Sequence, residues 1–200
     1  MRQAFSQAVS LGTTCQTSFQ IRRQFGALAR TSGIFDQQIT PVRAVLEYFH
    51  RDFRGMLEKD DLQEEGNTVV NVRFGTKHPH EFPHGIRQSY ENARSRHDYL
   101  CNKLRSVLDG DRSTLFVLAN TARANCVADE IRELIRKRNP RLQFDMIDLV
   151  TKEEPTRPEF YWQGNDVEWA VTFKSYRINP HSYVKRQLVR FANHLISSTR

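Results

Sequence analysis

The spacing of apolar residues at the start of the chain changes from strand-like to helix-like. Residues Phe5 to Leu11 form a short apolar run compatible with a strand, and a glycine follows it. Thr13 or Thr14 can cap a helix that runs to about Phe25, and Gly26 tolerates the backbone conformation that ends a helix. This pattern predicts a strand, a turn and a helix.

A second helix is marked by Thr40 as the cap and Pro41 as the first helical residue. Its apolar positions fall on one stripe: Val42, Val45, Leu46, Phe49, Phe53 and Leu57. We expect it to end near Gly55 to Lys59. Alternation from Val69 to Phe74 then predicts a strand with one exposed face, after a turn at Gly66 and Asn67. The proline-rich segment that follows, His78 to His84, predicts a loop.

The second half of the chain alternates regularly between helices and strands. Apolar positions from Ile86 step by four and three, which predicts a long helix closed by Asp109, Gly110 and Asp111. The remaining expected elements are a strand at Thr114 to Ala119, a helix from about Ala124 to Lys137, strands at Leu142 to Val150 and Glu168 to Phe173, and a helix at Tyr183 to Ile196. The first three of these make a βαβ unit with parallel strands.

These elements predict one α/β domain over residues 1–200. We expect a three-layer sandwich around a largely parallel sheet, with the hairpin region at a possible edge. Ligands of such folds bind beyond the carboxyl ends of the strands. The turns at Gly12 to Cys15, Asn120 to Asn125 and Val150 to Glu154 are therefore the places to look for function.

Composition narrows the function classes. The chain has 200 residues, with 30 Lys and Arg against 23 Asp and Glu, for a net charge of +7. The basic residues are scattered over the predicted helices, which is typical of solvated helix faces, so nucleic-acid binding is not favoured. Three cysteines without a C-x-x-C pair indicate neither a disulfide framework nor a structural zinc site.

The compartment is predicted from what the sequence lacks. No apolar run approaches the roughly 18 residues that span a bilayer, so we expect no membrane span. The residues Met1, Arg2 and Gln3 do not begin a signal peptide. A cytoplasmic location is the expectation.

Cys15 is the leading candidate for chemistry. It falls in the first turn of a predicted helix, where unpaired N–H groups and the helix dipole favour thiolate over thiol, so we expect a lowered pKa. The backbone N–H groups around Gly12, Thr13 and Thr14 would then bind the oxyanion of an acyl-transfer intermediate or another anion. The alternative is a small buried residue in a tight strand-to-helix junction.

A nucleophilic cysteine needs a base, and the loop supplies His78, His80 and His84. His97 lies on the apolar stripe of the long helix and is expected in the core or at its boundary. Glu81 and Asp36 are candidates to orient an imidazole.

Two other sites are conceivable from the residues. The three loop histidines with Glu81 are possible metal ligands, but their spacing fits no strong signature, and we predict neither a metal nor a cofactor. The turn from Ala119 to Asn125 lacks the glycines of a nucleotide-binding loop. Arg123 at its helix start could still hold a phosphate or carboxylate.

Three short motifs carry a resemblance to a known family. They are Ser10 to Cys15 (Ser-Leu-Gly-Thr-Thr-Cys), Ser32 to Asp36 (Ser-Gly-Ile-Phe-Asp) and His80 to Phe82 (His-Glu-Phe). In this order the chain resembles a bacterial family described as papain-like cysteine peptidases, over about its first 120 residues. The resemblance implies Cys15 as nucleophile, His80 as base and Asp36 as an orienting or structural acid. Ile34 and Gln37 depart from the Pro and Trp usual around the Phe-Asp pair.

Three functions follow as hypotheses. The first is a cysteine-dependent hydrolase or acyl-transfer enzyme acting on an unknown peptide or acyl substrate. The second is an α/β protein that binds an anionic small molecule, such as a nucleotide-sugar or sugar phosphate, near Gly12 to Thr14 and Arg123. The third is a basic interaction module without catalysis. The substrate and the oligomeric state are not readable from the sequence.

Overall fold

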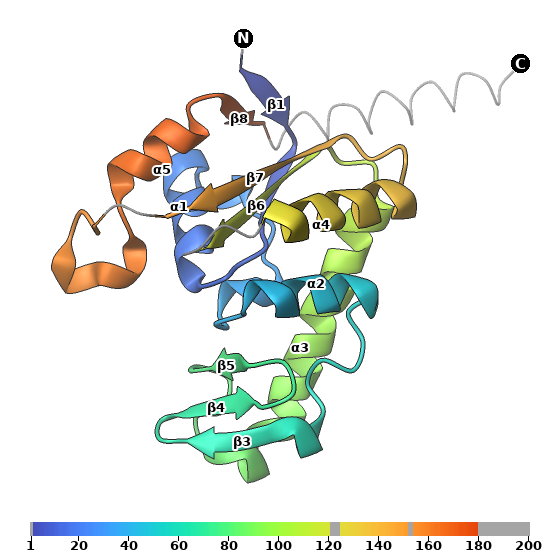
Figure 1. The fold of residues 1–200 in the computed structure, drawn as a ribbon, viewed down its shortest axis with the longest axis vertical. Helices are drawn as coiled ribbons and strands as arrows, with labels where there is room; N and C mark the ends of the chain where they lie inside the picture. The colour runs from blue at the N-terminus through green and yellow to red at the C-terminus, as the bar shows by residue number, and fades with distance from the viewer. Residues whose placement is uncertain (1, 121–124, 152–153, 180–200) are drawn as a thin grey trace, which may run out of the picture.

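A parallel three-stranded sheet forms the centre of the molecule (Figure 1). The computed structural model describes residues 2–120, 125–151 and 154–179. The central sheet has the order β2 (Gln7–Ser10), β6 (Thr114–Asn120) and β7 (Phe144–Val150), and both pairs of neighbours are parallel. The strand predicted at Thr114 to Ala119 is β6 and occupies the middle position, where both of its faces are covered.

Helices pack on both faces of this sheet. Within the described residues, the α-helices are α1 (Cys15–Phe25), α2 (Val42–His50), α3 (Gly85–Asp109), α4 (Asn125–Arg138) and α5 (Asp166–Phe173). Leu115 and Val117 of β6 join a buried cluster with Ile21 of α1 and Trp169 of α5. The alternate residue Phe116 faces the other way, into a cluster that includes residues of α2, α3 and α4. Successive side chains of one strand therefore hold two helix layers.

The described strands outside the central sheet form two smaller sheets. β1 (Gln3–Phe5) pairs in parallel with β8 (Tyr176–Ile178). β3 (Leu62–Glu65), β4 (Thr68–Asn71) and β5 (Thr76–His78) form an antiparallel sheet of their own. Figure 1 shows this sheet beside the first half of α3, away from the parallel strands.

Short 3₁₀ helices connect several of these elements. They are Ala27–Ala29, Ile34–Asp36, Lys59–Asp61 and Pro158–Gln163, of which the last is labelled η4 below.

Much of the predicted order of elements is confirmed. The chain is a mixed α/β protein with parallel sheets. Thr14 caps α1 by accepting a hydrogen bond from the Gln16 N–H, and Gly26 ends it at a φ of 85°. The long helix begins at Gly85, one residue before its predicted start, and ends at Asp109. The βαβ unit of β6, α4 and β7 is also present.

Other expectations were wrong. Residues Glu168 to Phe173, predicted as a strand, belong to the helix α5, because the Asn165 side chain accepts hydrogen bonds from two N–H groups of its first turn. The spacing of the buried Trp169 and Phe173 is helical, and a short apolar run does not distinguish the two structures. The hairpin region forms a separate sheet rather than an edge of the parallel one. α2 ends at His50, earlier than predicted.

Some predictions concern residues outside the described ones. The helix expected at Tyr183 to Ile196 and most of the turn after β6, including Arg123, lie there. Among the described helices, none combines the length and the hydropathy needed to cross a membrane.

The central strand allows a test of the fold. Phe116 is fully buried and its ring packs edge-on against Phe144, with 5.9 Å between the ring centroids. Phe116→Ala should lower the free energy of unfolding by about 3–5 kcal/mol, because it removes a buried ring and leaves a cavity. Urea denaturation measures this change. Tyr99→Ala, at a side chain that is 64% exposed, is the matched control and should leave stability nearly unchanged; equal losses in both variants would contradict the packing described.

Candidate functional site

The turn that carries Cys15 is held by the central sheet. The Gly12 carbonyl accepts hydrogen bonds from the Ala119 N–H, at 3.0 Å, and from the Thr17 hydroxyl, at 2.8 Å. Gly12 has a φ of 88°, a conformation that favours glycine, and a side chain there would contact Phe35. Cys15 follows as the first residue of α1, at the carboxyl end of β2.

The predicted anion donors of this turn are largely occupied. The Gly12 N–H donates to the Ser10 hydroxyl at 3.2 Å, and the Thr13 N–H donates to the Ala119 carbonyl at 2.9 Å. These two N–H groups are therefore not free to bind an oxyanion or a phosphate in this conformation. The prediction that Gly12 and Thr13 supply anion-binding N–H groups is corrected accordingly.

The Cys15 thiol is half-buried, and its electrostatics differ from the expectation. Burial raises the pKa of Cys15 above its ordinary value, and a hydrogen bond from its own backbone N–H opposes the rise. The lowered pKa expected from the helix start is therefore wrong, because desolvation outweighs the local N–H group. Among the described residues, no histidine nitrogen hydrogen-bonds to the thiol.

The Phe-Asp motif, Phe35 and Asp36, packs beside the turn that carries Cys15. Phe35 is fully buried, lies against Gly12 and packs edge-on against Tyr48. Asp36 is also buried: it accepts a hydrogen bond from Arg30 at 2.7 Å and from the Gly33 N–H at 3.1 Å. Burial raises the pKa of Asp36, and the charge of Arg30 opposes this rise.

The role of Asp36 as an acid that orients the base is therefore not supported. Its partners are an arginine and a backbone N–H, and no described histidine is among them. The position of Asp36 fits the structural role that the resemblance also allowed.

The three loop histidines differ in environment. His78 is buried at the end of β5, with its Nε2 atom 3.2 Å from the Thr76 hydroxyl, and its pKa falls to about 4 because burial disfavours the charged form. His84 lies at the start of α3. In the first turn of this helix, the Ile86 N–H donates to Glu64 of β3. His80 is exposed and follows β5 by two residues. His80 therefore combines exposure with nearness to β5.

Glu81 lies between two of these histidines. Its Oε2 atom is 4.0 Å from His78 Nδ1 and accepts a hydrogen bond from the His80 backbone N–H at 3.4 Å. Burial raises the pKa of Glu81, while hydrogen bonds from backbone N–H groups and the charge of His80 oppose the rise. Among the described residues, no group of three His, Cys, Asp or Glu side chains is placed to hold a metal.

A short segment, residues 37–40, joins the cysteine turn to the histidine strand. The Thr40 N–H donates to the Thr13 carbonyl at 2.8 Å. The preceding residue, Ile39, exchanges two hydrogen bonds with Lys77 of β5, at 2.9 and 2.8 Å. Cys15 and His80 lie two and three residues beyond these anchor points. The segment thus links the turn before Cys15 to the strand before His80, although these two residues are 65 positions apart in sequence.

Sequence reasoning missed the buried polar network beneath this segment. The Gln38 side chain donates to the hydroxyls of Thr40, at 2.9 Å, and Tyr48, at 3.3 Å. Tyr48 Oη lies 2.9 Å from His97 Nε2, and His97 Nδ1 lies 3.6 Å from Cys101 Sγ. His97 was predicted to be a core or boundary residue, which its burial confirms. The i,i+4 spacing of His97 and Cys101 was the one available signal that both face the same side.

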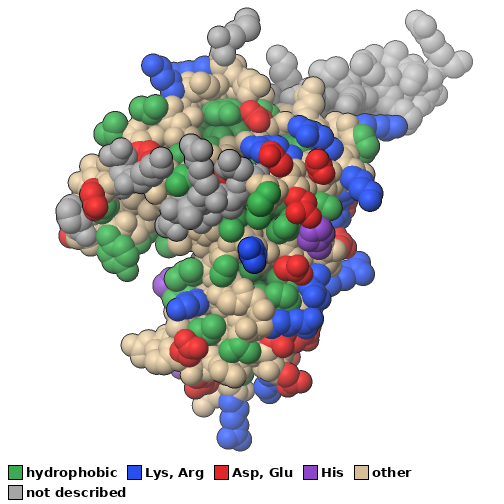
Figure 2. Space-filling model, in the orientation of Figure 1, with side chains coloured by type: hydrophobic (Ala, Val, Ile, Leu, Met, Phe, Trp, Pro, Cys, Tyr) green, Lys and Arg blue, Asp and Glu red, His purple; other side chains and the backbone are tan. Residues whose placement is uncertain are grey.

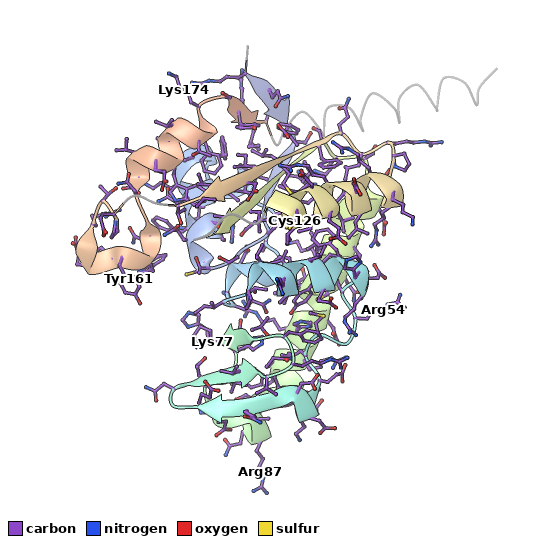
Figure 3. All side chains as sticks on the ribbon, viewed as in Figure 1. Arg54, Lys77, Arg87, Cys126, Tyr161 and Lys174 are labelled. Atoms are coloured by element: carbon purple, nitrogen blue, oxygen red, sulfur yellow. The ribbon has the colours of Figure 1, made fainter. Side chains whose placement is uncertain are left out.

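The part of the molecule around η4 and the part that carries β5 flank a recess in the surface (Figure 2). Figure 1 shows the amino end of α1, the 3₁₀ helix η4 and β5 on the same side of the molecule. Figure 2 shows a recess there, between the projecting part around η4 and the part that carries β5. Tyr161 extends from η4 and Lys77 from β5 on its two sides (Figure 3).

Comparisons with protein-family models, curated proteins and solved structures found no match to this chain. The geometry described above is therefore the basis for the functional argument.

The buried histidines predict a loss of stability in acid. His78 and His97 have pKa values lowered to about 4 by burial, against 6.5 for an unperturbed histidine. Between these values the unfolded chain binds protons that the folded chain does not, so stability falls as the pH drops from 6.5 towards 4, by up to about 1.4 kcal/mol per pH unit for each histidine.

Urea denaturation across this pH range measures the slope. His97→Gln should make it shallower, whereas His84→Gln, at an exposed histidine, should leave it unchanged. A slope that is the same in both variants would contradict the burial assigned to His97.

Proposed function

We propose that the protein is a cysteine-dependent hydrolase or acyl-transfer enzyme in which Cys15 is the nucleophile and His80 the base. The observation that supports this most is the convergence of three separated motifs. The cysteine turn rests on Phe35, and the 37–40 segment hydrogen-bonds both to that turn and to the strand preceding His80. A thiol at the start of a helix, linked through this segment to a strand that precedes an exposed imidazole, supports a role in covalent catalysis.

The proposed reaction has two steps. The Cys15 sulfur attacks the carbonyl carbon of the substrate, a carbon–sulfur bond forms, and the thiol proton passes to His80. The bond from the carbonyl carbon to the leaving nitrogen or oxygen then breaks, and the leaving group takes that proton. Water then attacks the carbonyl carbon of the thioester and gives a proton to His80. The carbon–sulfur bond breaks, the acid is released, and His80 returns the proton to the Cys15 sulfur.

The raised pKa of Cys15 shapes this proposal. A thiol that is protonated in the free enzyme needs a general base at the moment of attack rather than a preformed thiolate. The hydrogen bond between a nucleophile and its general base is often long in unliganded sites and shortens when substrate binds. His80 is exposed and lies on a loop, so its imidazole has room to approach the thiol.

His80 is favoured over its two neighbours by position. The buried His78 ring already faces the Thr76 hydroxyl and Phe82. His84 immediately precedes α3, whose first turn bonds to β3, the strand farthest from the 37–40 segment in the antiparallel sheet. Burial raises the pKa of the Glu81 carboxyl and the charge of His80 opposes this rise, so the orienting role is assigned to Glu81 in place of Asp36.

The anion-binding alternative has less support. Two of its expected donors, the N–H groups of Gly12 and Thr13, bond within the protein, and Arg123 lies outside the described residues. The same bonds mean that the proposal assigns no oxyanion role to Gly12 or Thr13.

Two finer expectations accompany the proposed function. The packing of α1 and α5 on one face of the central sheet and of α2, α3 and α4 on the other favours the three-layer sandwich. The three cysteines are free thiols, which favours a reducing compartment such as the cytoplasm.

The experiment is acylation by p-nitrophenyl acetate, followed by nitrophenol release and by mass spectrometry of the cysteine peptides. Cys15→Ala should abolish acylation, and His80→Ala should slow it by about 10²–10⁴-fold, the usual contribution of a general base. His84→Ala is the matched control, an exposed histidine of the same loop, and should retain the full rate. Acylation at Cys126 in place of Cys15, or equal rates in the two histidine variants, would overturn the proposal.

A further inference from the structure

Three consecutive aromatic side chains are exposed at the end of η4. Phe160 is 44% exposed, Tyr161 75% and Trp162 39%. Single exposed apolar residues are ordinary on protein surfaces, but adjacent large ones mark binding sites more often. We call residues 160–162 the aromatic rim.

The aromatic rim is fastened to the helix that carries Cys15. The Trp162 ring packs edge-on against Phe19, with 5.0 Å between the ring centroids. The Gln20 side chain donates to the Gln163 carbonyl at 2.7 Å, and Gln16 lies close over Gly164. These contacts fix Trp162 and the end of η4 relative to the first two turns of α1.

The rim and the thiol share one side of that helix. Cys15, Phe19 and Arg23 are four residues apart and form one stripe of α1. Phe19 meets Trp162, and Arg23 forms an ion pair with Asp166, just beyond the rim. The helix position one turn before Phe19 on the same stripe is Cys15 itself. The rim therefore lies next to the proposed nucleophile along the helix surface.

Residues 154–165, which contain the aromatic rim, form a loop whose two ends are joined by hydrogen bonds. These bonds keep the rim in place. The Thr156 N–H donates to the Gly164 carbonyl at 3.2 Å, and the Asn165 side chain donates to the Glu154 carbonyl at 2.7 Å. A loop with bonded ends presents its exposed side chains at a low cost in conformational entropy. Figure 3 shows Tyr161 at the edge of the recess described above.

We propose that the aromatic rim binds an aromatic or aliphatic group of the substrate, next to the carbonyl that Cys15 attacks. This inference rests on the proposed function and adds the substrate class to it: acyl donors with an apolar group, in preference to small polar ones. The rim supplies ring faces and edges for that group, and the thiol at the helix start reaches the adjacent carbonyl.

The test compares two reagents that alkylate thiols, iodoacetamide and its N-benzyl derivative. In both, the sulfur displaces iodide and its proton leaves to the base or to solvent, so the reagents differ mainly in the benzyl group. The rate of Cys15 alkylation by each is measured by mass spectrometry of the cysteine peptides. The ratio of the two rates is compared with that of the unfolded protein.

The folded protein should prefer the benzyl reagent, relative to the unfolded chain. Tyr161→Ala should reduce this preference by about threefold to tenfold, the effect expected of one aromatic contact. Tyr99→Ala removes a comparably exposed tyrosine, at 64%, from α3 and should leave the preference unchanged.

Each other outcome contradicts a definite part of the account. If Cys15 reacts with both reagents and Tyr161→Ala leaves their ratio unchanged, the rim is not a substrate site and the proposed function survives. If Tyr161→Ala instead shifts the sedimentation coefficient at an unchanged ratio, the rim is an interface between copies of the chain. If neither reagent labels Cys15 while Cys126 is labelled, the proposed function itself fails, and this inference with it.

Discussion

The backbone hydrogen bonds of residues 37–40 are the constraint on which the site depends. One residue, Thr40, bonds to the turn after the parallel strand β2, and its neighbour Ile39 pairs with β5 of the antiparallel sheet. These bonds use groups of fixed geometry on adjacent residues. They set the distance between the backbone of the cysteine turn and the backbone of the histidine strand.

A buried polar network holds this segment in place. Gln38 and Thr40 are buried, and the Gln38 side chain donates to the hydroxyls of both Thr40 and Tyr48, which in turn contacts His97. A satisfied hydrogen bond contributes about 0.5–1.5 kcal/mol, whereas a buried polar group left without a partner costs about 1–3 kcal/mol. The network therefore favours one conformation of the 37–40 segment strongly over alternatives that would leave its polar groups unpaired.

Burial also keeps the titratable groups of this network, His97 and Cys101, uncharged. Burial lowers the pKa of His97 to about 4 and raises that of Cys101 to about 12, so both are uncharged near neutral pH. Cys101 is consequently a poor nucleophile despite its histidine neighbour. Of the other two thiols, Cys15 is half-buried and Cys126 is exposed.

Local signals in the sequence were enough to predict several of the helices and the central strands, but not α5, the smaller sheets or the interior of the site. The caps at Thr14 and Gly26 and the spacing from Ile86 gave helix limits close to those observed, because these signals act over a few residues. The pairing of Asp36 with Arg30 and the bonds of Gly12 and Thr13 to Ser10 and Ala119 depend on how the chain folds back. The pKa of Cys15 depends on burial, which a sequence does not state.

The central claim is that the Cys15 thiol and residue 80 face the same recess closely enough to share a substrate. The most direct measurement is cross-linking by dibromobimane, a short reagent that becomes strongly fluorescent when it joins two nearby thiols. The variant His80→Cys should form a bridge to Cys15, identified by peptide mass spectrometry, whereas His84→Cys should not. A bridge from position 84 but none from position 80 would contradict the account.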